Sequence, residues 1–273
     1  AYTYTVTAAD VDTNDAVTLT GTTVPSWATF TASTGVLAGT PLDANVGDNS
    51  VVITASDGTA SATDTFTIVV ANTNDAPAVS STAVTAATED SSYSYSITTS
   101  DEDGSSLDSW TITATSISWL TLTDAGDGTA TLTGTPANGD VGDHSVTVTV
   151  TDAASATGTQ TFTITVANTN DAPTISSTAV TSATEDAAYT YTVTAADVDS
   201  GDTITLSGTT VPSWLTFTAS TGVLAGTPAN GDVGSNSVVI TATDAAGATA
   251  TDTFTITVAN TNDAPTISST AVT

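Results

Sequence analysis

The clearest pattern along the chain is a strict alternation of apolar and polar residues. From residue 189 to residue 195 the odd positions are Tyr, Tyr, Val and Ala, and every even position is Thr. A period of two is typical of a β-strand with one buried face and one face in water. Shorter runs of the same kind bring the number to about seven strands per copy of the pattern. In the last copy the predicted strands are Thr174–Val180, Tyr189–Ala195, Thr203–Ser207, Leu215–Phe217, Gly222–Ala225, Val238–Thr243 and Thr253–Val258.

The pattern occurs in three tandem copies. The segment Ala71–Pro77 returns as Ala167–Pro173 and as Ala259–Pro265, at spacings of 96 and 92 residues. Each copy also carries Tyr-x-Tyr, Asp-x-Asp, one mid-domain Trp and a Gly-Thr-Pro turn. A period near this length suits one antiparallel sandwich of about seven strands, so we expect an all-β chain of tandem Greek-key sandwiches. The predicted domains are residues 1–74, 75–170 and 171–262, with 263–273 as the first strand of a following repeat.

The ends of the chain do not coincide with the boundaries of the repeats. Ala1 corresponds to Ala188, so the first copy lacks an opening strand, whereas Asn262–Thr273 repeats Asn170–Thr181. Two interpretations stay open. The chain is an excerpt of a longer continuous array, or separate subunits join by donating this strand to the next first repeat.

The net charge of the chain limits which molecules it could bind. The chain has 29 acidic residues and neither Lys nor Arg, for a formal net charge of -29. Such a surface has nothing with which to neutralise phosphates, so nucleic acid and anionic membranes are poor partners. No window approaches the run of about 18 or more consecutive apolar residues of a membrane span, so no membrane insertion is expected in this segment. Cations are the expected ligands. Because Cys is also absent, a metal is the natural clamp for an extracellular chain of this kind.

Catalytic chemistry has few candidates. His144 is the sole imidazole and stands where the other copies have Asn49 and Asn236, which suggests a loop position that accepts any polar residue. The repeated Trp residues are interpreted as core anchors rather than ligand-stacking platforms. Trp110 is peculiar to the middle copy and is either packed or exposed. We therefore expect no enzymatic activity.

Several motifs follow one another in an order that resembles cadherin repeats. In the last copy they are Asp197-Val198-Asp199, Thr221–Leu224, Ala242–Asp244 and Asn260–Pro265. With the added Pro-Ser-Trp-Leu-Thr-Phe and Gly-Thr-Pro segments, the chain looks like the dystroglycan-type cadherin-like modules, also named Ig-like repeats, of large bacterial surface proteins. The resemblance covers all three copies.

The resemblance implies Ca²⁺ between successive domains, held by oxygen ligands. At the first junction it assigns Asn72, Asn74, Asp75, Asp101, Asp103 and Asp152. At the second junction it assigns Glu89, Asn168, Asn170, Asp171, Asp197, Asp199 and Asp244. The matching positions near the ends of the chain are Glu185, Asn260, Asn262, Asp263, Asp10, Asp12 and Asp57.

Two departures from the cadherin pattern predict fewer or weaker ions at each junction. The linkers begin with Asn where cadherins have Asp, and the Asp-Arg-Glu loop has no clear match, Asn138 and Asp140 being the nearest analogue. The alternative to a calcium site is a solvated acidic surface in which Asn and Asp serve as turn residues.

The leading functional hypothesis is an extracellular stalk or filament segment of a large bacterial surface adhesin, made rigid by calcium. Its partners would be neighbouring repeats of the same array or neighbouring subunits of a filament. The alternative is a module that binds a glycan or a partner cell. Its distinctive surface would be Trp110 together with the insertions of the middle copy near Gly104–Leu107 and Asp124–Asp127.

Overall fold

A computed structural model describes residues 1–12, 15–103 and 110–269. Its contacts divide the chain into two compact units. The first unit comprises residues 1–85, 93–134 and 144–164, and the second comprises residues 86–92, 135–143 and 165–273. Within the described ranges, no helix has the length and hydropathy that a membrane crossing requires.

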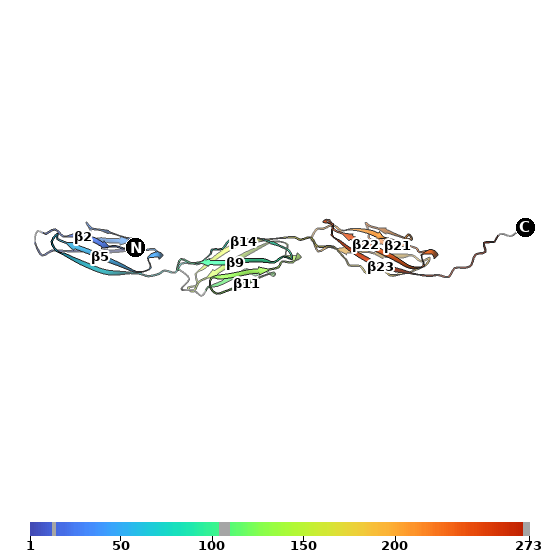
Figure 1. Cartoon of the computed structure of the whole chain (residues 1–273), viewed down its shortest axis with the longest axis horizontal. Helices are drawn as coiled ribbons and strands as arrows, with labels where there is room; N and C mark the ends of the chain where they lie inside the picture. Colours follow the sequence, from blue (N-terminus) through green and yellow to red (C-terminus); the bar gives the residue numbers. More distant parts are fainter. Residues whose placement is uncertain (13–14, 104–109, 270–273) are drawn as a thin grey trace. The chain divides into compact units, whose positions relative to one another are not determined.

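The described residues of the first repeat form six strands and one short 3₁₀ helix. Its sheets are β1-β4-β3 and β2-β5-β6, and Figure 1 labels β2 and β5. The elements are β1 (Tyr2–Thr5), β2 (Thr18–Thr23), β3 (Ala28–Thr31), β4 (Val36–Gly39), η1 (Asp43–Asn45), β5 (Gly47–Ser56) and β6 (Ser61–Val70).

In the middle repeat, residues 75–103 and 110–170 form two four-stranded sheets, in the orders β10-β13-β14-β8 and β11-β12-β9-β7. Its elements are β7 (Ala78–Val79), β8 (Ala86–Thr88), β9 (Tyr93–Ser100), β10 (Thr111–Ala114), β11 (Leu120–Asp124), β12 (Thr129–Gly134), η3 (Asn138–Asp140), β13 (Gly142–Thr151) and β14 (Thr157–Ala167). The sequence insertion near residues 104–107 lies outside the described residues.

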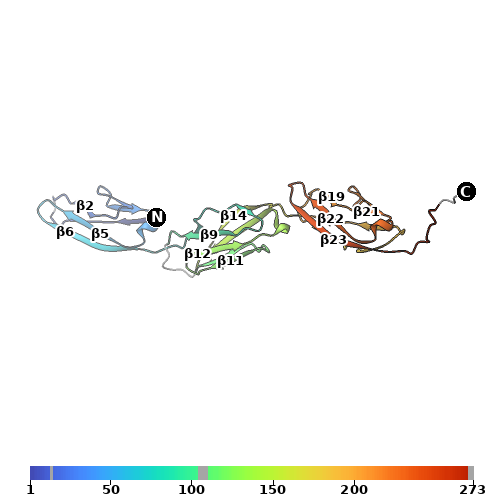
Figure 2. The same cartoon turned by 45° about the vertical axis from the view of Figure 1, so that its right-hand side comes forward.

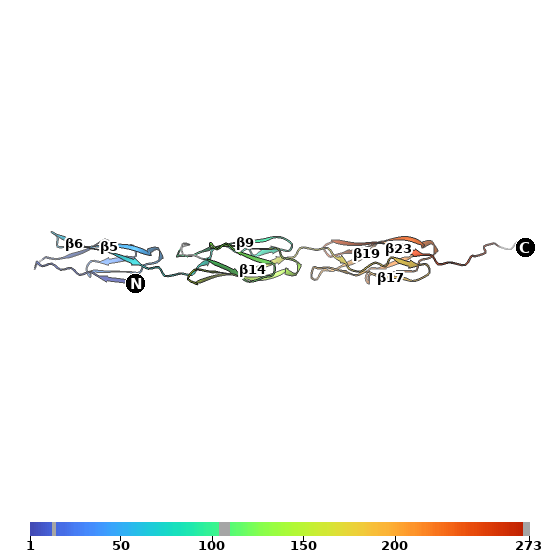
Figure 3. The ribbon, with the colours of Figure 1, turned by 90° about the horizontal axis from the view of Figure 1, so that it is seen from below.

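The third repeat has two layers, one with β22 and β23 and the other with β21 and β17; Figure 2 labels β22, β23 and β21, and Figure 3 labels β23 and β17. The sheets are β16-β23-β22-β19 and β17-β21-β20, with β15 paired to β18. The elements are β15 (Thr174–Ile175), β16 (Ser182–Thr184), β17 (Tyr189–Thr192), β18 (Ala195–Ala196), β19 (Thr205–Thr210), β20 (Leu215–Thr218), β21 (Val223–Gly226), η4 (Asn230–Asp232), β22 (Gly234–Thr243) and β23 (Thr249–Ala259). The predicted all-β fold of tandem sandwiches is confirmed.

The opening strand of the third repeat differs from its prediction. The predicted strand Thr174–Val180 forms a ladder only over Thr174–Ile175, and Ser182–Thr184 forms a second strand that was not predicted. The first piece pairs antiparallel with β18 and the second pairs parallel with β23, in the opposite layer. The chain therefore crosses between layers midway, in the stretch 176–184 (Ser-Ser-Thr-Ala-Val-Thr-Ser-Ala-Thr), which has no strict alternation that would mark where one strand ends and the next begins.

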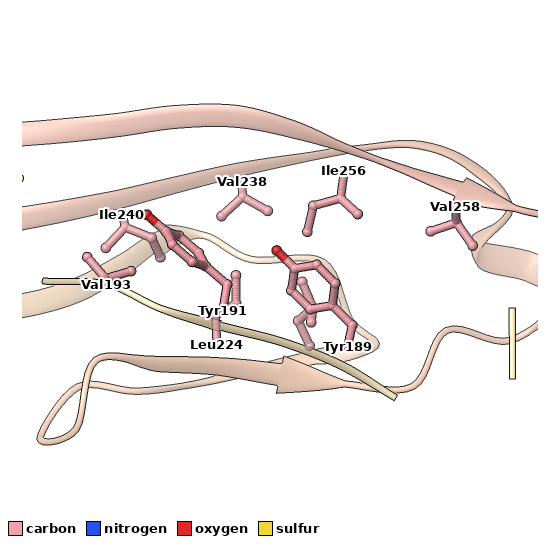
Figure 4. Close-up of a cluster of buried hydrophobic side chains, with 9 residues drawn as sticks. Tyr189, Tyr191, Val193, Leu224, Val238, Ile240, Ile256 and Val258 are labelled. Atoms are coloured by element: carbon pink, nitrogen blue, oxygen red, sulfur yellow. The ribbon is translucent and has the colours of Figure 1, made fainter. Parts of the chain in front are cut away.

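The inward positions form the core that the alternation predicts. In the third repeat Tyr189, Tyr191 and Val193 face strands β22 and β23 across the sandwich (Figure 4). Trp214 packs edge-on against Tyr189, with ring centroids 5.7 Å apart. In the Gly-Thr-Pro turn an added Cβ at Gly226 would collide with the carbonyl oxygen of Trp214, so the turn glycine lets the Trp segment approach closely.

The structure shows whether Trp110 is packed and whether His144 lies in a loop. Trp110 is only 6% exposed, so it is packed. His144 lies within strand β13 rather than in a loop, and its ring meets the Trp119 indole edge-on. The prediction of a permissive loop position is therefore wrong, because the residue at this position faces the anchoring Trp of its repeat.

Candidate cation-binding clusters

Three carboxylates converge within the second compact unit. One oxygen each from Glu89, Asp171 and Asp199 lies within 4.8 Å of the others, and we call these residues the second acidic cluster. Glu89 is 1% exposed and Asp199 8% exposed. Because the chain contains no Lys or Arg, no basic side chain offsets this concentration of negative charge.

The loop after β8 fixes the position of Glu89. Its backbone N–H donates to the carbonyl oxygen of Ala167, and the next residue, Asp90, adopts a left-handed conformation with φ of 57°. The N–H of Asp90 then donates to the carbonyl oxygen of Pro136, which fixes the turn. As a result the carboxylate of Glu89 faces the linker, where its Oε2 accepts a 3.1 Å hydrogen bond from the N–H of Thr169.

Asp199 has several hydrogen-bond donors. Its Oδ2 accepts a 2.8 Å bond from the backbone N–H of Asp171, and its Oδ1 accepts bonds from the Nδ2 groups of Asn168 (2.9 Å) and Asn138 (3.2 Å). These donors, the Asp171 N–H first and Asn168 next, lower the pKa of Asp199 below its usual value. The carboxylate is therefore held ionised, as a metal ligand must be.

Asn170 joins the linker to another predicted ligand. Its Nδ2 donates to Asp244 Oδ2 at 2.9 Å, and Asp244 Oδ1 accepts a 2.7 Å bond from the N–H of Ala248. The hydrogen bond from Asn170 is the main cause that lowers the pKa of Asp244. Asp244 therefore lies at the linker but outside the three-carboxylate cluster.

The first junction, inside the first compact unit, repeats two of these bonds. The N–H of Asp75 donates to Asp103 Oδ2 at 2.7 Å, and the Nδ2 of Asn74 donates to Asp152 Oδ2 at 2.8 Å. Asp101 accepts a bond from the backbone N–H of Asp103. The two junctions therefore use the same local geometry.

The carboxylates that cluster at the first junction include one predicted ligand, Asp75, and two residues that were not predicted, Asp43 and Glu102. Asp43, Asp75 and Glu102 bring one oxygen each within 4.8 Å, and we call them the first acidic cluster. All three are exposed, as is the predicted ligand Asn72. The charge of Asp43 is the main cause that raises the pKa of Asp75, and a hydrogen bond and the charge of Asp43 raise that of Glu102. Asp43 and Glu102 were both missed, although Asp43 stands where the middle repeat has Asn138, the nearest analogue of the Asp-Arg-Glu loop.

One buried oxygen at each junction supports a metal ion. Among the described residues, Asp103 Oδ1 and Asp197 Oδ2 have no hydrogen-bond partner. A buried carboxylate oxygen without a hydrogen-bond donor is unfavourable, and a bound cation would satisfy it. Asp197 also groups with Asp199 and Asp202, so hard oxygen ligands of the kind that Ca²⁺ prefers lie close together. The residues present fit such an ion, with Glu89 and Asp199 as the most buried carboxylate ligands.

The end of the third repeat carries part of the same arrangement. Glu185 is 2% exposed, and its Oε2 accepts a 2.9 Å bond from the N–H of Thr261, as Glu89 does from Thr169. The carboxylate of Asp263 accepts a bond from Asn230.

The remaining predicted ligands are not brought into these clusters. Asn260 and Asn262 donate to the carbonyl oxygens of the residues that follow them. Asp57 accepts backbone bonds from its own turn, which lower its pKa. A separate exposed group consists of Asp10, Asp12 and Asp15.

The family of the chain follows from a comparison with family models. The model described as Putative Ig domain matches residues 1–71, 76–167 and 172–259, and the chain belongs to this family. The predicted Ig-like tandem repeats are thereby confirmed. A search of curated proteins finds no match.

Solved structures show the same architecture. The extracellular cadherin domains 1–5 of protocadherin gamma B2 match with a TM-score of 0.60 at 17% identity, over 90% of this chain and 53% of that one. The domains 3–6 of protocadherin gamma B7 match with a TM-score of 0.55 at 18% identity, over 89% of this chain and 66% of that one. At these identities the likeness shows the fold alone.

A further match is an endo-fucoidan hydrolase of glycoside hydrolase family 107, at 29% identity over 89% of this chain. The chain spans only 39% of the length of that enzyme, and the TM-score is 0.35. This match carries no argument about activity.

Proposed function

We propose that the chain is a segment of an extracellular stalk or filament of a large bacterial surface adhesin, in which Ca²⁺ at the two acidic clusters makes successive repeats rigid. The observation that carries the proposal is the second acidic cluster. Glu89 belongs to a loop of the middle repeat, and Asp171 belongs to the linker that follows this repeat. Asp199 belongs to a loop of the third repeat. An ion held by all three would restrain the linker.

The family and the fold support this function in a general way, since tandem Ig-like and cadherin-like repeats are typical of adhesion and spacer modules. The bacterial setting rests on the resemblance of the repeats alone. A role as a glycan-binding module lacks its main candidate residue, because a Trp110 that is 6% exposed offers no stacking surface. We propose no catalytic role.

Calcium titration of the chain tests the proposal. Since an ion that binds only the folded clusters stabilises them by mass action, calcium should raise the thermal midpoint, and small-angle scattering should show reduced linker freedom. Chelation should reverse both effects at moderate ionic strength. Magnesium at the same ionic strength controls for screening of the net charge of -29. If magnesium matched calcium, or if chelation changed neither observable, the calcium function would be rejected.

A further inference from the structure

The third repeat has a strand edge with free backbone groups. Its strand β18 pairs with β15 alone, and the N–H of Ser176 donates to the carbonyl oxygen of Thr194. Because hydrogen-bonded and non-hydrogen-bonded pairs alternate in an antiparallel ladder, the next pair, Ile175 with Ala195, is not hydrogen-bonded. The N–H and the carbonyl oxygen of Ala195 therefore point away from β15, and neither has a hydrogen-bond partner among the described residues.

An open pocket of about 310 Å³ lies beside this edge. Its lining comes from residues 193–195, from Ile204 and Leu206, and from the turn 219–222 between β20 and β21. Val193 belongs to the buried core, and Leu206 packs against that core. The place therefore combines an apolar floor with unpaired backbone groups, and this combination accepts an added strand.

The middle repeat fills the equivalent place with a side chain of its own. In the alignment of the repeats Ile112 corresponds to Leu206, so Trp110 corresponds to Ile204. Trp110 is 6% exposed, and an added Cβ at Gly128 would lie 3.5 Å from its indole. In the middle repeat an aromatic ring thus occupies the position that is an open pocket in the third.

The middle repeat also supplies a partner for the backbone edge. Thr99 corresponds to Ala195, and its N–H donates at 3.1 Å to the carbonyl oxygen of Gly128. The hydroxyl of Thr99 donates to the same oxygen at 2.7 Å. Gly128 reaches this place because the hairpin of β11 and β12 is longer than that of β20 and β21. The shorter turn of the third repeat leaves the edge open.

We propose that the third repeat binds an extended peptide of a partner protein along the free edge of β18, with an aromatic side chain of the peptide in the pocket beside Ile204. The peptide would supply what Gly128 and Trp110 supply in the middle repeat. One of its carbonyl oxygens would accept the N–H of Ala195, and its ring would cover Leu206. This binding goes beyond the spacer function proposed above and uses no calcium.

Charge restricts which aromatic peptides fit this site. Asp197 follows Ala195 by two residues, and Asp202 precedes Ile204 by two. The chain has no Lys or Arg that could offset these carboxylates. A peptide with Lys or Arg on either side of its aromatic residue would therefore be favoured over an acidic peptide.

Calorimetric titration in chelator tests the contact with a defined probe, the blocked peptide Lys-Thr-Trp-Thr-Lys. The control peptide Lys-Thr-Ala-Thr-Lys has the same charge without the ring, and N-acetyltryptophanamide has the ring without the strand. Each control should bind at least about tenfold more weakly than the probe, because each makes only part of the contact. If either control bound as tightly as the probe, or if the probe did not bind, the proposal would be overturned.

Filling the pocket from within should block binding. Ile204→Trp gives the third repeat the residue that the middle repeat has at Trp110, and it should lower the affinity for the probe at least about tenfold. The control Val233→Trp adds the same ring at a position that is 39% exposed and outside the pocket, so it should leave the affinity unchanged. An equal loss in both variants would place the peptide elsewhere.

A second pair of variants tests the backbone contact. Ala195→Pro removes the N–H that the peptide should accept, and it leaves the ladder with β15 intact because that N–H takes no part in it. The matched control Ala195→Ser keeps the N–H. The Pro variant should bind the probe at least about tenfold more weakly than the Ser variant, at a similar thermal midpoint. Equal affinities would exclude binding along the strand edge.

Amide hydrogen exchange of the unaltered chain provides a readout that needs no variant. Exchange at Ala195 should slow at least about tenfold when the probe saturates the chain, since the amide becomes hydrogen-bonded. Unchanged exchange at saturation would overturn the proposal. All these measurements are made in chelator, so failure of the calcium titration would leave the peptide site standing, and failure of peptide binding would leave the calcium function standing.

Discussion

The indole of Trp119 meets the ring of His144 edge-on, with centroids 5.9 Å apart and an interplanar angle of 81°. In the first and third repeats the equivalent Trp instead donates its Nε1–H to Asn Oδ1, at 3.0 Å and 3.1 Å. Among the described residues, Trp119 Nε1 is buried without an acceptor. The middle repeat therefore lacks a hydrogen bond that anchors its two neighbours.

We predict that His144→Asn stabilises the middle repeat by about 1 kcal/mol, the net worth of a restored hydrogen bond to a buried donor. Denaturant unfolding followed by Trp fluorescence measures the change. The reciprocal variant, Asn236→His, should destabilise the third repeat by a similar amount, because it leaves Trp214 Nε1 without its acceptor. Changes of the same sign in both variants would contradict the explanation.

Much of the fold could be predicted because it depends on local alternation. The run from Tyr189 to Ala195 has one apolar face, and that face is the core. The crossing of the opening strand between layers could not be predicted, because it is decided by which edges are free, and edges exist only once the sheets have formed. The structural role of His144 was missed for a similar reason, since its partner Trp119 is 25 residues away in the sequence.

The candidate site was predicted in part. Glu89, Asp171 and Asp199 converge as the ordered motifs implied. Asp43 was not included, because the motif series has no Asp at that point and only the alignment with Asn138 could have indicated it. Ligand sets assembled from several loops depend on distances that motif order does not contain.

The carboxylate of Asp199 should dominate cation binding at the second acidic cluster. We predict that Asp199→Ala lowers calcium affinity there by about tenfold or more, because the variant removes both a ligand and the acceptor that orients Asn138 and Asn168. Isothermal titration calorimetry measures the loss. The control Asp48→Ala removes the same charge from an exposed position outside both clusters. A loss of the same size in the control would mean that net charge alone governs binding.

Two tyrosines should resist titration with base. Burial raises the pKa of Tyr93 and Tyr189 to about 12, and each hydroxyl donates at 2.7 Å to the carbonyl oxygen of Val84 or Val180, respectively. In the folded chain the pKa of each hydroxyl lies above the value of 10.0 that it has when unfolded. The protonated hydroxyls therefore contribute fully to the stability of the fold below pH 10.0, and this contribution is lost as the pH rises through about 12.

The ultraviolet absorbance of phenolate should therefore appear in two phases, the later one together with unfolding. Tyr189→Phe should lose about 1 kcal/mol at neutral pH with its hydrogen bond, yet the third repeat should become less sensitive to base. A single absorbance phase near pH 10 in the folded chain would contradict this assignment.

The two clusters differ at one equivalent position, Asp43 in the first and Asn138 in the second. Asp43 raises the pKa of both Asp75 and Glu102, so without a cation the folded first cluster gains stability as the pH falls through these raised values. We predict that Asp43→Asn makes the calcium-free chain more stable at neutral pH, because it removes this repulsion, and that it weakens calcium binding at the first cluster. Thermal unfolding in chelator and calorimetric titration measure the two effects.

Asn138→Asp is the matched opposite change. It replaces an amide that donates to Asp171 and Asp199 with a fourth carboxylate, so the calcium-free second cluster should lose stability at neutral pH. With calcium the added ligand should increase affinity, because each carboxylate adds charge and oxygen ligands to the site. The two variants should therefore shift calcium affinity in opposite directions. If the shifts had the same sign, or if Asn138→Asp destabilised the chain equally with and without calcium, the clusters would be acidic surface and not cation sites.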